Sequence, residues 1–118
     1  MKMSAKRSSR TEFYRSVARG VTLVDFNASW CQPCRKQALI IKALQKEFRK
    51  SAQVMTVNIN NHPDLALKIG IQSIPTMILY QEGKEIDRFV GLRTKQELGR
   101  ALKKAIHSFS TGKHVARR

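Results

Sequence analysis

The hydrophobic positions of the chain fall into short continuous runs separated by stretches with helical spacing. Residues 21–26 (VTLVDF) form a nearly unbroken apolar run rich in β-branched side chains, which is typical of a strand buried on both faces. Similar runs at 53–59, 76–80 and 85–90 predict three further strands. Because Gly83 supplies a turn between the last two, we expect those strands to be antiparallel neighbours.

Helical spacing fills the stretches between the strands, where apolar residues recur three or four positions apart. The resulting alternation predicts an α/β fold, with a mixed central sheet covered by helices on both faces. The helices are predicted over residues 11–20, 34–50, 63–70 and 94–109. The apolar faces of the two long helices are predicted to contain Ala38, Ile41, Leu44 and Phe48 in the first, and Leu98, Leu102, Ala105 and Phe109 in the second.

The length and composition fit one small globular domain. A chain of 118 residues with 42% hydrophobic residues can bury a core of its own. We assign the domain to residues 11–110, with a basic tail at 1–10 that we expect to be disordered and a second basic tail at 111–118. The sequence shows no apolar run long enough to cross a membrane and no apolar segment typical of a secretory signal. We therefore expect a monomeric cytoplasmic protein without membrane association.

The positive charge is large and unevenly distributed. Lys and Arg number 23 against 8 Asp and Glu, for a formal net charge of +15. Residues 1–20 and 34–50 each hold six basic and one acidic side chain, and residues 93–118 hold eight and one, whereas residues 51–92 hold three and four. Such a field attracts acidic proteins or nucleic acid. Solvated helix faces and basic tails without a specific partner are the alternative interpretation.

The only two cysteines lie close together in WCQPC, at residues 30–34. This segment joins a predicted buried strand to a long predicted helix, so Cys31 lies near a helix N-terminus, where the helix dipole and free N–H groups favour a thiolate. Arg35 and Lys36 add positive potential. Cys34, one turn further along, is expected to be more buried and protonated, and the spacing lets the two sulfurs meet. Cys31 is therefore the predicted nucleophile and Cys34 the resolving thiol.

Two segments resemble the active-site region and the downstream half of the thioredoxin family: VTLVDFNASWCQPCRKQ at residues 21–37 and GIQSIPTMILYQEGKEIDRFVG at residues 70–91. The resemblance runs without obvious gaps over about residues 21–102. It implies a thioredoxin fold with a sheet of four to five strands. Because residues 1–10 lack a strand pattern, we expect the first edge strand to be short or missing.

The resemblance also implies a chemistry and its partners. It predicts a protein-disulfide reductase that works through a mixed disulfide, with the redox-active Cys31–Cys34 disulfide and no other cofactor. Its substrates would be proteins that contain disulfides, and its electron donor would be similar to thioredoxin reductase.

Asp25 is the candidate proton carrier of this chemistry. A carboxylate inside an apolar strand is costly to ionise, so its pKa should rise. The resemblance places it beneath the cysteines, where it would move protons to and from Cys34. The family often has a lysine near this carboxyl group, but Thr56 stands at the matching position and brings no charge, so we expect an unusually strong rise. An Asp that is merely hydrogen-bonded at a strand end is the alternative.

Four residues are predicted by the resemblance to bind substrate. Pro75 corresponds to a proline that is cis in the family and faces the dithiol, and Ile74 would offer its backbone to an extended substrate segment. Gly91 matches a glycine that lets the substrate backbone approach closely, with an ordinary strand end as the alternative. Trp30 is expected to cover the disulfide and to form part of the partner surface, with a tryptophan of the core as the alternative.

The chain departs from the family pattern around the cysteines. Gln32 replaces a common glycine in the active-site loop, next to Pro33, which restricts the backbone between the cysteines. This change leaves the redox potential open. Asn27 stands where a second tryptophan is common, which reduces the aromatic support of the site. Leu39 replaces a proline that kinks the helix, so we expect a straighter helix.

Other interpretations of the cysteines and of the charge stay open. A structural zinc site needs about four ligands; His62, His107 and His114 show no ligand spacing to the pair, so we expect no metal. An inert structural pair is a second alternative. A more oxidising disulfide oxidase or isomerase is a third, although Pro33 beside Cys34 and the missing signal favour a reductase. A basic module that binds nucleic acid or acidic proteins is a fourth, but the sequence has no aromatic stacking platform and no nucleic-acid motif.

Overall fold

A computed structural model describes residues 9–111 of the chain, and all eight elements expected from the sequence are present in it, most within two residues of the predicted bounds. The first helix begins at Ser9, two residues earlier than predicted. Most of the two predicted tails lies outside the described residues. In chain order the elements are α1 (Ser9–Val17), β1 (Val21–Asn27), α2 (Gln32–Glu47), β2 (Gln53–Asn58), α3 (Pro63–Ile69), β3 (Thr76–Gln81), β4 (Lys84–Val90) and α4 (Lys95–Ser110).

The four strands form one mixed sheet in the order β2-β1-β3-β4. β1 pairs in parallel with β2, whereas the β1–β3 and β3–β4 pairs are antiparallel, as predicted for the last two strands. The residues that precede α1 lie outside the described range, so the expectation of a short or missing first edge strand stays a prediction. The sheet is thus the predicted α/β arrangement, with β1 at its centre.

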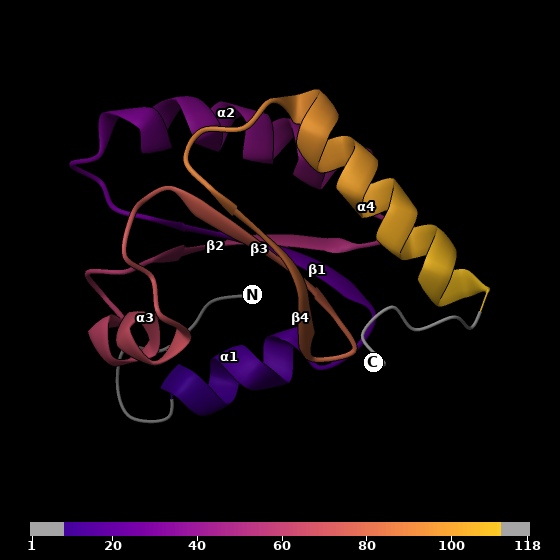
Figure 1. Cartoon of the computed structure of the whole chain (residues 1–118), viewed down its shortest axis with the longest axis horizontal. Helices are drawn as coiled ribbons and strands as arrows, with labels where there is room; N and C mark the ends of the chain where they lie inside the picture. Colours follow the sequence, from indigo (N-terminus) through magenta and orange to yellow (C-terminus); the bar gives the residue numbers. More distant parts are fainter. Residues whose placement is uncertain (1–8, 112–118) are drawn as a thin grey trace.

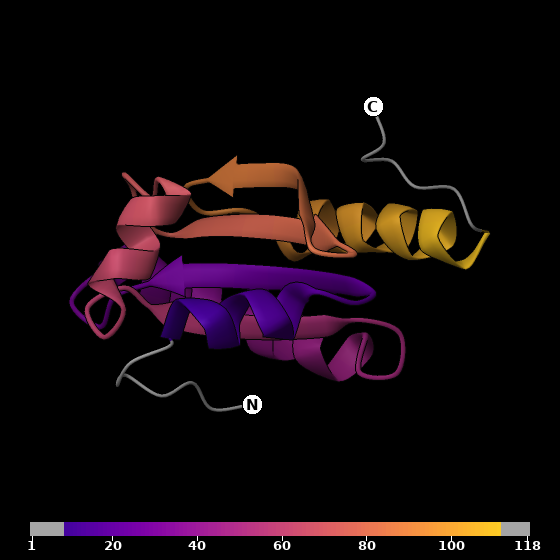
Figure 2. The same cartoon turned by 90° about the horizontal axis from the view of Figure 1, so that it is seen from below.

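Helices cover both faces of the sheet (Figure 1). In this view α2 and α4 lie on one side and α1 and α3 on the other, and Figure 2 shows the strands side by side, with α1 in front of them and α4 behind. Alternate residues of β1 enter different cores, because successive side chains of a strand point to opposite faces. Leu23 packs with α2 and α4, and Val24 packs with α1 and α3. The predicted burial of this strand on both faces is therefore confirmed.

The same alternation directs Asp25 to the face of Leu23, which is the face covered by α2. The first turn of α2 holds the second cysteine, so the strand and the helix together bring a carboxyl group under the cysteine pair. No helix within residues 9–111 is long and apolar enough to span a membrane.

Two predictions about the helix faces are wrong. Ala38 is exposed, and Gln37 takes its place on the buried face of α2. The buried positions Cys34, Gln37, Ile41 and Leu44 follow one another at intervals of three and four residues, so they form one continuous stripe. Phe109 is 39% exposed because the last turn of α4 extends past the end of the sheet, where no strand lies beneath it (Figures 1 and 2).

Candidate active site

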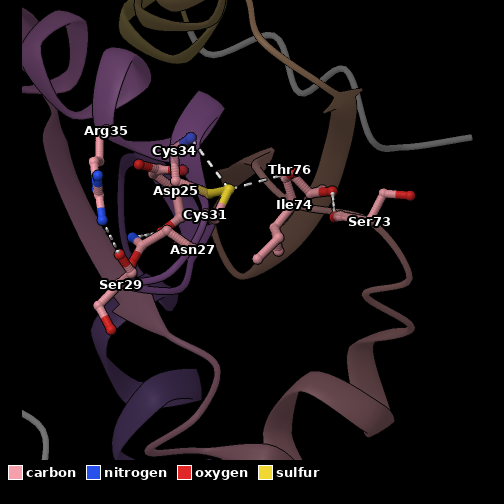
Figure 3. The surroundings of a disulfide bond; sticks show 9 residues. All are labelled: Asp25, Asn27, Ser29, Cys31, Cys34, Arg35, Ser73, Ile74 and Thr76. Atoms are coloured by element: carbon pink, nitrogen blue, oxygen red, sulfur yellow. Dashed lines mark hydrogen bonds between the residues drawn. A yellow bond between two sulfur atoms is a disulfide. The ribbon is translucent and has the colours of Figure 1, made fainter.

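Cys31 and Cys34 form a disulfide where β1 passes into α2, with their Cα atoms 5.2 Å apart. Cys31 is the N-cap of α2, and its Sγ accepts a hydrogen bond from the backbone N–H of Cys34 at 3.2 Å (Figure 3). Pro33 lies in the first turn, where a missing N–H costs nothing. A thiolate on Cys31 would therefore face the positive end of a helix of 16 residues.

The two cysteines are equally buried, each 4% exposed, so the predicted difference in burial is not present. In the disulfide the Sγ of Cys31 turns inward, where it lies 3.9 Å from the backbone oxygen of Ile74 (Figure 3). Ala28 shares the small apolar cluster around the disulfide, and Ile59 and Ile74 pack against it. The disulfide is thus shielded from water over most of its surface, next to the backbone of Ile74.

Asp25 is 1% exposed, and neither of its carboxyl oxygens has a hydrogen-bond partner among the described residues. Burial raises the pKa of this carboxyl group from 3.8 to about 7, and the nearby Asn27 amide opposes only part of the rise. The predicted direction is therefore confirmed. A carboxyl group with this pKa can both take up and release a proton near neutral pH.

A depression of about 250 Å³ connects this carboxyl group with the surface. Cys34 and Asp25 both line it, and Figure 3 draws Asp25 beside the disulfide. Thr56, which pairs with Asp25 across β1 and β2, lies exposed at its wall and brings no charge. Arg35 is the cation that lines the depression, and it donates to the backbone oxygen of Ser29 at 3.4 Å. The depression thus brings solvent close to the buried carboxyl group.

Asn27 lies beside the Asp25 carboxyl group, at the position where a second tryptophan is common in the family. Its Nδ2 donates to the backbone oxygen of Asp25 at 3.1 Å, which fixes the end of β1. The amide is small, and it lines the depression together with Ala28. The smaller side chain therefore leaves space where the family commonly has a tryptophan.

The predicted substrate-binding residues lie around the disulfide. Trp30 is 66% exposed, so the alternative of a core tryptophan is wrong, and its role as a cover of the disulfide stays a prediction. The Ile74–Pro75 peptide is cis, as predicted. Ile74 is half-buried beside the cysteines, and Pro75 is buried.

Gly91 lies next to Pro75, because its N–H donates to the Pro75 oxygen at 2.8 Å. Its φ of +93° is a conformation that side chains other than glycine rarely adopt. An added Cβ would meet nothing within 4 Å, so the position opens to solvent. Gly91 therefore satisfies a backbone requirement and also leaves room for an approaching chain.

The remaining site predictions concern the loop and the metal. Gln32 and Pro33 are both exposed at the start of α2. Leu39 is 72% exposed, and the straighter helix that it should permit stays a prediction. Within residues 9–111 no three His, Cys, Asp or Glu side chains gather as metal ligands would, and His114 lies outside these residues.

Gln37 is a residue of the site region that sequence reasoning missed. It is fully buried, and its side-chain amide forms two hydrogen bonds with the backbone of a single residue, an arrangement here called the fork. Its Nε2 donates to the Arg93 oxygen at 3.0 Å, and its Oε1 accepts from the Arg93 N–H at 2.8 Å. Because Arg93 follows Gly91 by two residues, this fork ties α2 to the predicted substrate-binding segment. The sequence signal for this residue is its position: Gln37 lies three residues after Cys34 and four before Ile41, so it falls on the buried face of the helix.

Comparison with known proteins agrees with this geometry. The family model for thioredoxin matches residues 4–104. The chain is similar to the thioredoxin of Chlamydia caviae, with 42% identity over 94 residues that cover 80% of this chain and 91% of the relative. It is also similar to the thioredoxin of Staphylococcus aureus, with 34% identity over 79% of this chain and 89% of the relative.

A solved structure gives the same result for the fold. The thioredoxin of Fasciola hepatica superposes with a TM-score of 0.75 over 89% of this chain and 99% of its own, at 28% identity. The match to the family model over residues 4–104 spans both the disulfide segment and Pro75.

Proposed function

This chain belongs to the thioredoxin family and is a thiol–disulfide oxidoreductase, and from this premise we propose that it reduces disulfides in other proteins. The observation that carries the proposal is the N-cap position of Cys31, with the Cys34 N–H directed at its sulfur. This arrangement stabilises a negative charge on Cys31 when the disulfide is reduced.

In the first step the Cys31 thiolate attacks one sulfur of a substrate disulfide. A bond forms between Cys31 Sγ and that sulfur, the substrate S–S bond breaks, and the other substrate sulfur leaves as a thiolate. Positive charge at the N-terminus of α2 favours the thiolate form of Cys31 before the attack. Arg35, exposed in the first turn, adds to this potential.

In the second step Cys34 resolves the mixed disulfide. Its thiol gives a proton to the Asp25 carboxylate, and the resulting thiolate attacks Cys31 Sγ. The mixed disulfide breaks, so the second substrate sulfur leaves reduced and the Cys31–Cys34 disulfide forms. Two electrons pass from the dithiol to the substrate. The raised pKa of Asp25, about 7, suits a group that accepts a proton near neutral pH.

The surface around the disulfide supports docking of an extended segment. Trp30 offers an exposed aromatic side chain, and the segment from Ile74 to Pro75 lies directly beside Cys31. Gly91 leaves open space next to it. A substrate strand that pairs with the backbone at Ile74 would bring its disulfide to the Cys31 sulfur.

Trapping tests the order of the two thiols. The reduced Cys34→Ser variant should form a stable mixed disulfide with a protein such as insulin, because Cys31 attacks and no thiol resolves the product. The Cys31→Ser variant should trap little, because Cys34 lies inside α2 and does not have the N-cap position that stabilises a thiolate on Cys31. Equal trapping by both variants would contradict the assigned roles while leaving the family intact.

The redox potential tests the direction of electron flow. A reductase should have a potential close to about −270 mV, whereas the more oxidising members of this fold lie at about −180 to −120 mV. Equilibration of the disulfide with glutathione mixtures gives this value. A reductase should also accept electrons from a thioredoxin-reductase-like enzyme, which continuous insulin reduction with such a donor measures. A potential in the oxidising range would assign the opposite direction.

A further inference from the structure

The helical layer formed by α2 and α4 carries most of the described positive charge. The exposed Lys and Arg side chains of residues 35–50 and 95–104, here called the basic face, number ten, and the same segments contain two carboxylates. The layer of α1 and α3 on the other side of the sheet is different: residues 9–20 and 63–70 hold four cations and two carboxylates. Figures 1 and 2 show that these layers lie on opposite sides of the sheet, so the charge is concentrated on one side.

The cations of the basic face are largely free of protein counter-charges. Within the described residues their one ion pair joins Lys95 Nζ to Glu47 Oε1 at 2.9 Å. The other carboxylate, Glu97, reaches back to cap α4 at Thr94. A groove of about 250 Å³ lies between the two helices, and Arg100 and Lys103 line it beside this ion pair. The remaining cations therefore need anions from outside the molecule to balance them.

We propose that the basic face binds the phosphate backbone of double-stranded nucleic acid without reading its sequence. Lys and Arg side chains on helix surfaces are the groups that neutralise phosphates, and the displaced counterions supply the binding free energy. The face runs for about 17 Å along α2, from Arg35 to Lys46 at a rise of about 1.5 Å per residue, and Arg49 and Lys50 follow just past the end of the helix. Phosphates follow one another about every 3.4 Å along one strand, so several can be contacted together.

The composition of the face favours phosphates over an acidic protein. Protein interfaces depend on a buried centre of aromatic or aliphatic anchors. The large exposed apolar side chains of α2 and α4 are Leu39, in the second turn of α2, and Phe109, in the last turn of α4. Leu39 lies among cations of α2, but one aliphatic side chain does not form such a buried centre. The absence of an aromatic platform among the described residues of this face also argues against single strands, which bind by stacking.

Arg35 and Lys36 lie beside the dithiol, but the other cations of the basic face lie further away from it. Lys46 lies in the last turn of α2, about 22 Å along the helix from Cys31. Arg100 and Lys103 face the groove near Glu47, which is also at the far end of α2. A nucleic acid on these residues would leave the disulfide accessible to a protein substrate.

Fluorescence anisotropy with a short mixed-sequence DNA duplex tests the proposal on the full-length chain. Neutralising four cations should weaken binding at least tenfold at about 0.1 M KCl and reduce the slope of log K against log[KCl] by about 3 to 4, because each lost phosphate contact removes about 0.9. Insulin reduction should not change. The basic-face variant combines Lys46→Gln, Arg49→Gln, Arg100→Gln and Lys103→Gln.

A control variant with the same net charge separates the face from the overall charge. It neutralises four cations of the opposite layer, and its binding should fall less than threefold. Equal losses in both variants would show that only the net charge matters and would overturn the proposal. Circular dichroism and insulin reduction verify that each variant is folded; if the first is not, the pairs at positions 46/49 and 100/103 are tested separately. The control combines Arg10→Gln, Arg15→Gln, Arg19→Gln and Lys68→Gln.

Competition identifies the class of polyanion. Unlabelled duplex should displace the labelled duplex at a lower concentration of charge than poly-glutamate or a single strand of the same length. Displacement by poly-glutamate at an equal or lower concentration would assign the face to acidic proteins and overturn the nucleic-acid proposal. Stronger displacement by the single strand would overturn the preference for duplex.

Discussion

Asp25 places an ionisable carboxyl group in the middle of a buried strand, where its protonation depends on folding. Its pKa is about 7 in the folded chain and about 3.8 when exposed. Between these values the folded state holds a proton that the unfolded state has released, so unfolding becomes easier as pH rises. The stability associated with neutral Asp25 is fully present below pH 3.8 and is lost as pH rises through about 7.

Asp25→Asn should therefore flatten the dependence of stability on pH. The free energy of unfolding of the parent chain should fall by up to about 4 kcal/mol between about pH 4 and pH 7 because of Asp25. The variant has no ionisable group at this position, so its free energy of unfolding should stay nearly constant over the same range. Urea unfolding at a series of pH values measures both. Parallel profiles for the two proteins would contradict the raised pKa.

Thr56→Lys provides an independent control at the same carboxyl group. A cation at this position, paired with Asp25 across β1 and β2, should stabilise the carboxylate and lower its pKa. The loss of stability should then begin at a lower pH than in the parent chain. A matched Thr56→Met variant, which adds length without charge, should leave the profile in place.

At this scale the sequence could predict residues whose chemistry depends on local pattern. Cys31 at the start of a helix and Asp25 within an apolar strand both follow from their neighbours along the chain. Gln37 does not, because its meaning depends on the peptide of Arg93, 56 residues away. The equal burial of the cysteines also depends on Ile74, a residue of a distant loop that packs against the disulfide.

Between elements, Gln37 joins α2 to the segment that follows β4. Gln37→Leu keeps a similar volume but leaves the N–H and the oxygen of Arg93 without partners. We expect a loss of about 2 kcal/mol in the free energy of unfolding. We also expect a raised KM for insulin, because a protein substrate needs the segment near Gly91. The rate with a small disulfide such as dithiobis(nitrobenzoate) should change little, because this compound does not need that segment.

Gln45→Leu is the matched control for this prediction. Gln45 makes one exposed hydrogen bond, from its Nε2 to the Val54 oxygen at 3.0 Å. Its loss should cost no more than about 1 kcal/mol and should leave the KM for insulin unchanged. A Gln37→Leu variant that loses stability but keeps the parent KM would limit the fork to a structural role.

Arg88 joins β4 to the C-terminal end of α3. Its guanidinium forms two 2.8 Å bonds with Glu85 and donates to the carbonyl oxygens of Ile69 at 3.0 Å and Gly70 at 3.3 Å. These oxygens lack partners within the helix. The α3 end leads directly into the loop that carries the cis Pro75, so Arg88 holds the start of that loop.

Arg88→Met should lower the free energy of unfolding by about 1 to 2 kcal/mol, because the carbonyl oxygens lose a charged donor. Hydrogen exchange should quicken at the amides of Gly70 and Ile71, which close the helix by bonds to Ala66. Lys84→Met, on the same strand and without a recorded side-chain partner, should change neither. Faster exchange throughout the chain, with no excess at Gly70 and Ile71, would contradict the local role.

The positions of the elements were predictable because the spacing of apolar residues along the sequence differs between strands and helices. The strand at 21–26 and the helix at 63–70 are found close to the predicted places. The errors arise where a face depends on neighbours in space. Ala38 is one residue away from the buried stripe of α2, and Phe109 fits the apolar period of α4 but lies beyond the sheet that would cover it.

Across the whole molecule, the net charge of +15 opposes the compact state. Three ion pairs are recorded within residues 9–111, all partly exposed, and such pairs contribute little. Repulsion among the cations of the basic face acts over about 17 Å along α2, from Arg35 to Lys46. The Debye length is about 30 Å at 0.01 M salt and about 10 Å at 0.1 M, so this repulsion is screened within that range.

We therefore expect stability to increase when KCl rises from about 0.01 M to about 0.1 M, in contrast to proteins whose surface ion pairs dominate. Urea unfolding measures the effect, and chloride is preferred because sulfate strengthens apolar burial by itself. The basic-face variant should be more stable than the parent chain at low salt and should respond less to KCl. The variant of the opposite layer should respond nearly as strongly as the parent, because its cations are fewer and lie among carboxylates. A parent chain that loses stability as KCl rises would show that attraction between paired charges outweighs the repulsion, and the α2–α4 layer would then need no external anion.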